Sequence, residues 1–236
     1  MVQTPTLPIE GLAAAERILG ANLLGPPAIA QTFGAPVEAI LGTDETAGLG
    51  RLPFEPKVLE RAAEFGALLI LRMPRDQRGP LSIRGLHERF PEAFATKSMS
   101  EGVGYQLRSE WATLDQPFAE DVPDGGWRLV MTEPLRETRG RPYDQQDATL
   151  PRWATRLGVP PERVRRRSAV DAVYDVVVTF KARGARLLAG SWDWTRTPTP
   201  DGAFVTVGNF RDSGLEILAY STAVRFAALG VCPEVV

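Results

Sequence analysis

GNFRDSGLEILAYSTAVRFAALGVCPEVV, residues 208–236, ends a chain in which 24% of the residues are charged. Chain ends are usually polar and frayed. This one is dominated by small and apolar side chains, and its charged residues from position 214 onward are Glu216, Arg225 and Glu234. The composition of this segment therefore differs from that of a typical chain end.

Residues 208–217 predict two strands joined by a turn, because apolar residues flank the sequence Arg-Asp-Ser-Gly. Two structures are open for the segment that follows. Residues 221–229 are rich in alanine and precede Gly230, which favours a short helix with a Ser or Thr cap. Taken together with the two strands, the same residues instead form a loop that returns to a final strand at 230–235.

The composition is that of a globular protein with one domain, or one domain and an extension: 236 residues, 44% of them hydrophobic. The sequence shows no apolar run of the roughly 20 residues that span a bilayer, and no signal peptide, which favours a cytoplasmic or phage-associated location. Cys232 is the single cysteine and His87 the single histidine. These counts exclude an internal disulfide framework and a zinc site built from cysteine and histidine.

A net charge of -2 provides no basic field for nucleic acid, so we expect no nucleic-acid partner. The chain does contain one local basic cluster: Arg163, Arg165, Arg166 and Arg167. We interpret this cluster as a solvated turn before a helix. His87 lies on a predicted helix without a cysteine, serine or aspartate nearby, and we interpret it as a surface residue.

The first half of the chain predicts short helices separated by glycine and proline. Helices are expected at 9–19, 27–33, 56–65 and 82–90, with Ser82 capping the last of them, and a buried strand is expected at 67–72. Residues 91–126 show a weak pattern, in which Trp111 and Phe118 would anchor a loop-rich connection.

The second half predicts a strand at 127–133, a helix at 142–150 and a longest helix after Ser168. Ser168 and Asp171 have the spacing of a capping box, and Gly184 is placed to end that helix. Strands follow at 190–196, 204–210 and 215–219. Helices followed by a strand-rich C-terminus predict an α+β protein with helices packed on a small antiparallel sheet.

Catalytic patterns are weak. Trp192 and Trp194 fit the anchors of a sheet, or alternatively an aromatic platform for a sugar or base. Asp193 with Glu133 or Asp201 would be a carboxylate pair for acid and base catalysis. A nucleophile elbow, a phosphate-binding glycine loop and an H-E-x-x-H motif do not occur in the sequence, so an enzyme is the minority interpretation.

The C-terminal motif resembles the variable region of the variable proteins of diversity-generating retroelements. In such tails, a motif of the type G-x-F-x-x-x-G-L-x-V leads through a changeable segment to L-G-[LV]. Glu216 and the ending CPEVV depart from this pattern. The residues that match it are Gly208, Phe210, Gly214, Leu215, Ile217, Arg225, Leu229, Gly230 and Val231.

The resemblance implies a C-type-lectin-like fold at 101–236, preceded by a helix-rich region at 1–100, and a non-catalytic protein that binds an unknown protein or glycan, with an oligomer possible. It also implies anchoring by Phe210, Leu215, Ile217, Tyr220 and Leu229. Among the residues of the variable surface, Leu218, Tyr220, Val224 and Phe226 are expected to make the main contacts. The surface would comprise Leu218, Ala219, Tyr220, Ser221, Thr222, Ala223, Val224, Phe226, Ala227 and Ala228.

No metal or other cofactor is expected. Sugar-binding C-type lectins hold calcium with Glu-Pro-Asn-like and Trp-Asn-Asp-like ligands, whereas this chain has Glu133-Pro134-Leu135 and Trp192-Asp193-Trp194. Formylglycine-generating enzymes share the lectin-like fold but need paired cysteines. The alternatives to a retroelement protein are a structural or protein-interaction α+β domain without diversification, and a carboxylate-dependent enzyme.

Overall fold

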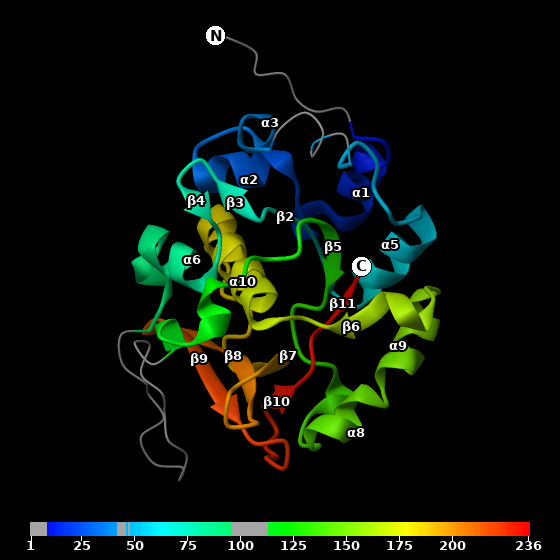
Figure 1. Cartoon of the computed structure of the whole chain (residues 1–236). Coiled ribbons are helices and arrows are strands. Elements are labelled where there is room, and N and C mark those ends of the chain that lie inside the picture. Colours follow the sequence, from blue (N-terminus) through cyan, green and yellow to red (C-terminus); the bar gives the residue numbers. More distant parts are fainter. Residues whose placement is uncertain (1–8, 42–45, 47, 96–112) are drawn as a thin grey trace.

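The computed structural model describes residues 9–41, 46, 48–95 and 113–236, and it confirms the expected α+β class (Figure 1). A five-stranded sheet has the order β1-β2-β5-β11-β6, and a four-stranded sheet has the order β10-β7-β8-β9. The strands of the first sheet are β1 (Leu23–Leu24), β2 (Leu68–Arg72), β5 (Gly126–Val130), β6 (Val164–Arg166) and β11 (Pro233–Val235). Those of the second are β7 (Trp192–Pro198), β8 (Phe204–Arg211), β9 (Gly214–Tyr220) and β10 (Leu229–Gly230).

The five-stranded sheet joins the two halves of the chain. β2 pairs with β5 in antiparallel register, from Leu68 opposite Val130 to Arg72 opposite Gly126. β11, at the end of the chain, lies antiparallel between β5 and β6. The expected boundary between residues 1–100 and 101–236 therefore runs through a sheet and a shared core, and the N-terminal helices complete the domain.

Helices surround the sheets, and the four expected before residue 91 are present, together with a short helix at 37–40 that the sequence pattern did not predict. The helices before residue 95 are α1 (Leu12–Leu19), α2 (Pro26–Phe33), α3 (Val37–Ile40), α5 (Pro56–Glu64) and α6 (Ile83–Arg89). Those after residue 113 are α8 (Tyr143–Asp147), α9 (Leu150–Leu157) and α10 (Ala169–Arg183). The expected helix at 142–150 is shorter, because α8 ends at Asp147 and a new helix, α9, begins at Leu150 with Pro151 in its first turn. A short ribbon of β3 (Arg75–Asp76) and β4 (Gly79–Pro80) precedes α6.

Helix α10 is the central helix of the molecule, and its predicted ends are confirmed. The Ser168 hydroxyl accepts from the Asp171 amide at 3.2 Å, and the Asp171 carboxylate accepts from the Ser168 amide at 3.3 Å. Gly184 ends the helix with a φ of 69°, which favours glycine. All residues of α10 from 169 to 179 are buried, including Asp175, because the helix packs against α2, α6 and both sheets.

Two features expected at the surface are buried in part. The arginine cluster forms strand β6 and the residues around it, with Arg166 and Arg167 buried. His87 is half-buried, and its ring packs edge-on against Phe94. Phe118 is buried as expected, whereas Trp111 lies outside the described residues. Among the helices that the structure describes, we find none with the length and hydropathy needed to cross a membrane.

Candidate recognition surface

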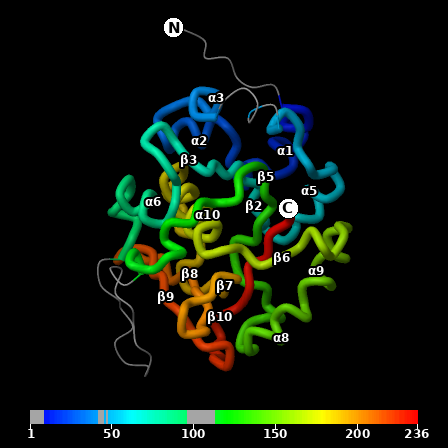
Figure 2. Tube along the Cα trace, in the orientation of Figure 1, coloured from blue at the N-terminus to red at the C-terminus, as the bar shows by residue number. Residues whose placement is uncertain are grey.

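The segment at 221–228, which we name the crossing loop, runs across the end of the four-stranded sheet. It starts after β9 at one edge of the sheet and ends at β10 on the other edge, where β10 pairs in parallel with β7. From β10 the chain, red in Figure 2, runs on to the C-terminus, and β11 on the way pairs with β5 in the other sheet. Residues 221–228 form turns and irregular backbone, so the helix interpretation is wrong and the loop interpretation is confirmed.

Main-chain hydrogen bonds fix the crossing loop. Two of them come from neighbouring elements and two close turns within the loop or at its end. The bonds run from Tyr143 N to Thr222 O (3.1 Å), from Trp192 N to Ala228 O (2.8 Å), from Val224 N to Ser221 O (3.0 Å) and from Leu229 N to Phe226 O (3.0 Å). Because these bonds join main-chain atoms, a change of side chain leaves each donor and acceptor in place.

The residues expected to form the variable surface divide into three groups. Ser221, Ala223 and Ala227 are exposed, and Ala219, Thr222, Phe226 and Ala228 are half-buried. Leu218, Tyr220 and Val224 are buried, with exposed fractions of 5%, 8% and 8%. The expectation that these three make surface contacts is wrong, because they point into the protein beneath the loop.

An aromatic cluster lies beneath the crossing loop. Tyr220 packs edge-on against Trp192 and against Phe226, with ring centroids 6.4 and 5.5 Å apart. Tyr143 stacks on Phe204 at 4.2 Å and meets Trp194 edge-on at 5.2 Å. Both tryptophans are buried, so they anchor the sheet as expected and offer no accessible aromatic platform. Leu218, Val224 and Leu229 complete the cluster.

Tyr143 and Phe204 are members of this cluster that the sequence did not single out. Burial raises the pKa of Tyr143 to about 12, so its hydroxyl stays protonated and donates to Thr195 O at 3.1 Å. The expected anchors, in contrast, are all confirmed as buried residues: Phe210, Leu215, Ile217, Tyr220 and Leu229. Side chains from α8, β8 and β9 thus pack together beneath the crossing loop and support it.

A network of buried charges lies in the interior, between the sheets and α10. Arg72 contacts Asp175, Glu234 and Asp171, with nitrogen to oxygen distances of 2.7, 2.6 and 3.0 Å. Arg167 bridges Asp175 and Asp193 at 2.9 and 2.7 Å. The members of the network are fully buried or nearly so. Two arginines expected to be solvated, Arg166 and Arg167, are therefore interior residues paired with acceptors.

The network leaves little room for catalysis by its carboxylates. Asp193 is 0% exposed, and its oxygens accept from Arg167 and from the Cys232 amide. Glu133 accepts from Ser191, and Asp201 lies in the β7–β8 turn. The minority interpretation, an acid and base pair of Asp193 with Glu133 or Asp201, is therefore not supported, because Asp193 is fully buried.

Asp124, Asp171 and Glu234 bring carboxylate oxygens within 4.8 Å of one another, as the ligands of a metal ion do. Arg72 bridges Asp171 and Glu234, and Arg165 contacts both Glu234 and Asp124. These guanidinium groups already supply the positive charge that a cation would bring. We therefore assign the cluster a structural role.

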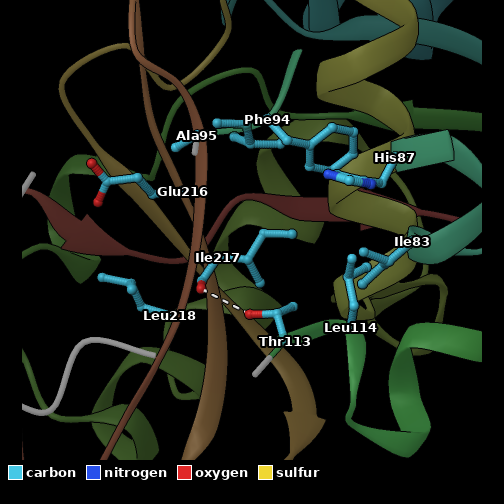
Figure 3. A pocket seen from close by; sticks show the side chains of 10 residues that line it. Ile83, His87, Phe94, Ala95, Thr113, Leu114, Glu216, Ile217 and Leu218 are labelled. Atoms are coloured by element: carbon cyan, nitrogen blue, oxygen red, sulfur yellow. Dashed lines mark hydrogen bonds between the residues drawn. The ribbon is translucent and has the colours of Figure 1, made fainter. Parts of the chain in front are cut away.

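A small apolar pocket lies between α6 and β9 (Figure 3). Its volume is about 30 Å³, an order of magnitude below the roughly 300 Å³ of the smaller ligand pockets. His87 and Phe94 form one wall, and Ile217 lies opposite them, where its carbonyl accepts from Thr113 at 3.4 Å. The described walls hold little more than water, so the crossing loop remains the better candidate.

Comparisons with protein-family models, with curated proteins and with solved structures find no match to this chain.

Proposed function

We propose that this protein is a non-catalytic ligand-binding protein of a diversity-generating retroelement, with a C-type-lectin-like fold. The crossing loop is its recognition surface, and the ligand is a protein or a glycan. One observation carries the proposal: main-chain bonds fix the shape of the loop, while Ser221, Ala223 and Ala227 project into solvent. A surface that changes its side chains between copies needs this separation of shape from side-chain identity.

The position of the crossing loop within the chain also supports the proposal. β9 precedes the loop in the four-stranded sheet, and β11 follows it in the five-stranded sheet. Both ends of the loop are therefore tied to ordered strands, although the loop is close to the C-terminus. A binding loop mounted in this way loses little conformational entropy when it meets a ligand.

Structure narrows the set of positions that we propose as variable. Ala219, Ser221, Thr222, Ala223, Phe226, Ala227 and Ala228 keep some exposure, whereas the three buried residues support the loop from below. Phe226 is the strongest contact candidate, because its ring rests on Tyr220 and its remaining surface is open to solvent. Rigid aromatic side chains commonly carry much of the energy of a binding surface.

Two libraries displayed on phage test this proposal. One randomises the exposed residues Ser221, Ala223 and Ala227 together with Phe226, and the matched library randomises the buried residues Leu218, Tyr220 and Val224. Both are selected against lysozyme as a defined protein probe. We expect folded lysozyme binders from the first library and loss of folded display from the second. A first library that folds but yields no binder, or a second that folds equally well, would contradict the proposal.

The DNA downstream of the gene provides an independent test. We expect a near-copy of the codons for residues 208–231 that differs at adenines, beside a reverse transcriptase gene. The differences should fall at the codons of the exposed and half-buried loop residues and spare those of Leu218, Tyr220 and Val224. Differences spread evenly over both groups would contradict the division that the structure makes.

A further inference from the structure

Helix α8 connects the crossing loop to the rest of the protein. Its first residue, Tyr143, donates its amide to Thr222 O at 3.1 Å, which fixes the start of the loop. The Tyr143 ring stacks on Phe204, and its hydroxyl reaches Thr195 O. Any movement of α8 is therefore passed to the loop through a main-chain bond.

Helix α8 cannot hold this position by itself. It comprises only Tyr143–Asp147, and its N-cap, Pro142, makes no side-chain capping bond. Isolated helices shorter than about 12 residues are marginal in water. The orientation of α8 must therefore come from contacts with other elements.

Arg166 supplies those contacts. Its guanidinium carbon lies 3.9 Å from the centroid of the Tyr143 ring, and Nη2 donates to Tyr143 O at 2.9 Å. Nε donates to Asp147 at 2.6 Å, so one side chain binds both ends of α8. Nη1 donates to Trp194 O at 2.7 Å and to Gln146 Oε1 at 3.3 Å, which ties the helix to strand β7. The planar, five-donor guanidinium suits this task, and a lysine cannot reproduce it.

We infer that Arg166 is a positioning residue for the recognition surface, acting through α8 and the bond from Tyr143 N to Thr222 O. The role of the surface in recognition rests on the proposed function. The dependence of the loop's structure on Arg166 can be measured without a ligand. Arg166 itself is 4% exposed, so it sets the shape of the surface without touching the ligand.

Arg167 provides a matched control. It follows Arg166 in the sequence and is also buried, and it pairs with two carboxylates, whereas Arg166 pairs with one, that of Asp147. Its contacts, Asp175 and Asp193, belong to the charge network rather than to α8. Arg166→Lys and Arg167→Lys therefore make the same substitution at two adjacent buried positions, and only the first of them contacts α8.

Amide hydrogen exchange of the full chain tests the structural part. In Arg166→Lys we expect the amides of Tyr143, Val224 and Leu229 to exchange roughly tenfold faster, with strand β8 unchanged. In Arg167→Lys the exchange rates of these three amides should change no more than those of the β8 amides. Equal effects of both variants on the loop, or a loop unchanged in Arg166→Lys, would overturn the inference.

A milder variant and a binding measurement complete the test. Should Arg166→Lys fail to fold, Asp147→Ala removes one partner of Arg166 at a half-exposed position and should accelerate the same amides by a smaller factor. A lysozyme binder from the library should lose roughly tenfold in affinity with Arg166→Lys and little with Arg167→Lys. An unchanged affinity would overturn the inference. If Arg166→Lys speeds the exchange of the loop amides but the library yields no binder, only the proposed function is contradicted.

Discussion

The crossing loop and the C-terminal segment that follows it, residues 229–236, are neighbours in sequence with opposite construction. In the loop, main-chain bonds set the shape, and side chains such as Ser221 and Ala223 face solvent. In the C-terminal segment, residues 229–235 are all buried, and Glu234 joins Arg72 and Arg165. A segment can therefore change its side chains only where those side chains do not hold its backbone in place.

The largest loss of stability is expected in the charge network that holds the C-terminal segment. Arg72→Ala leaves Asp171, Asp175 and Glu234 without their shared cation in the interior. Removing one partner of a buried ion pair costs about 3–5 kcal/mol, because the remaining charge is uncompensated. Urea unfolding measures the change in the free energy of unfolding.

Arg51→Ala is the control for this prediction. Arg51 pairs with Glu10 on the surface, where both side chains are largely exposed. Such pairs contribute about 1 kcal/mol or less. Comparable losses in the two variants would show that the network does not hold the segment more firmly than a surface pair.

A somewhat smaller loss is expected from two buried leucines of β9, the strand that precedes the loop. Leu215 is 2% exposed in the main core, and Leu218 is 5% exposed in the aromatic cluster. Leu215→Ala or Leu218→Ala should each cost on the order of 2 to 4 kcal/mol through lost burial and the cavity left behind. Thermal unfolding measures this loss. A loss below about 0.5 kcal/mol for Leu218→Ala would show that Leu218 behaves as an exposed residue of the recognition surface.

Gly230 marks the transition between the two segments. A Cβ atom there would lie 2.6 Å from Thr138 Oγ1 and 2.9 Å from Pro134 Cβ. Overpacking of this kind costs roughly 1–3 kcal/mol, so we expect that loss in Gly230→Ala. Gly190→Ala is the matched control, because its Cβ would meet nothing within 4 Å. Denaturant unfolding of both variants should show a loss only in the first.

Acid should weaken the C-terminal segment through Asp171. Burial opposes its ionisation, but the charge of Arg72 and hydrogen bonds from Ser168 and Asp124 prevail and lower its pKa below 3.8. The unfolded chain thus takes up this proton at a higher pH than the folded chain. The stabilisation is complete above the ordinary pKa and is lost as the pH falls through the folded value.

Asp171→Asn tests that linkage. Below about pH 4 we expect the variant to lose stability less steeply than the parent protein, because one group that favours folding in its charged form is gone. Urea midpoints measured from pH 6 down to pH 2.5 give both slopes. Identical slopes would assign the acid sensitivity to the other carboxylates of the network.

Local structure could be predicted from the sequence wherever its cause is local. Ser168 and Gly184 mark the ends of α10 because capping depends on a few adjacent residues. The burial of Arg167 could not be predicted, because its acceptors, Asp175 and Asp193, come together only in the folded chain. The same holds for Tyr143, whose partners Phe204 and Thr222 are far away in sequence.

The anchors of the candidate surface were more predictable than its extent. Leu215 and Ile217 flank Glu216 and so lie on one face of the predicted strand, and the structure buries both. Val224 has no such pattern, since a loop of turns has no fixed period. Its burial depends on the turn that Ser221 O closes with the Val224 amide, which turns this side chain inward.

The smallest effect on stability is expected from substitutions of the exposed side chains of the crossing loop itself. Replacing Ala219, Ser221, Ala223 and Ala227 together with glutamine adds polar side chains at exposed or half-buried positions. Surface substitutions usually change stability by less than about 0.5 kcal/mol each, so the melting temperature should stay nearly unchanged. Glutamine at Leu218, Tyr220 and Val224 is the control, and it should prevent folding because three buried apolar groups become polar. A loss of several kcal/mol in the first variant would mean that the exposed side chains hold the loop, and a surface of that kind could not be rewritten.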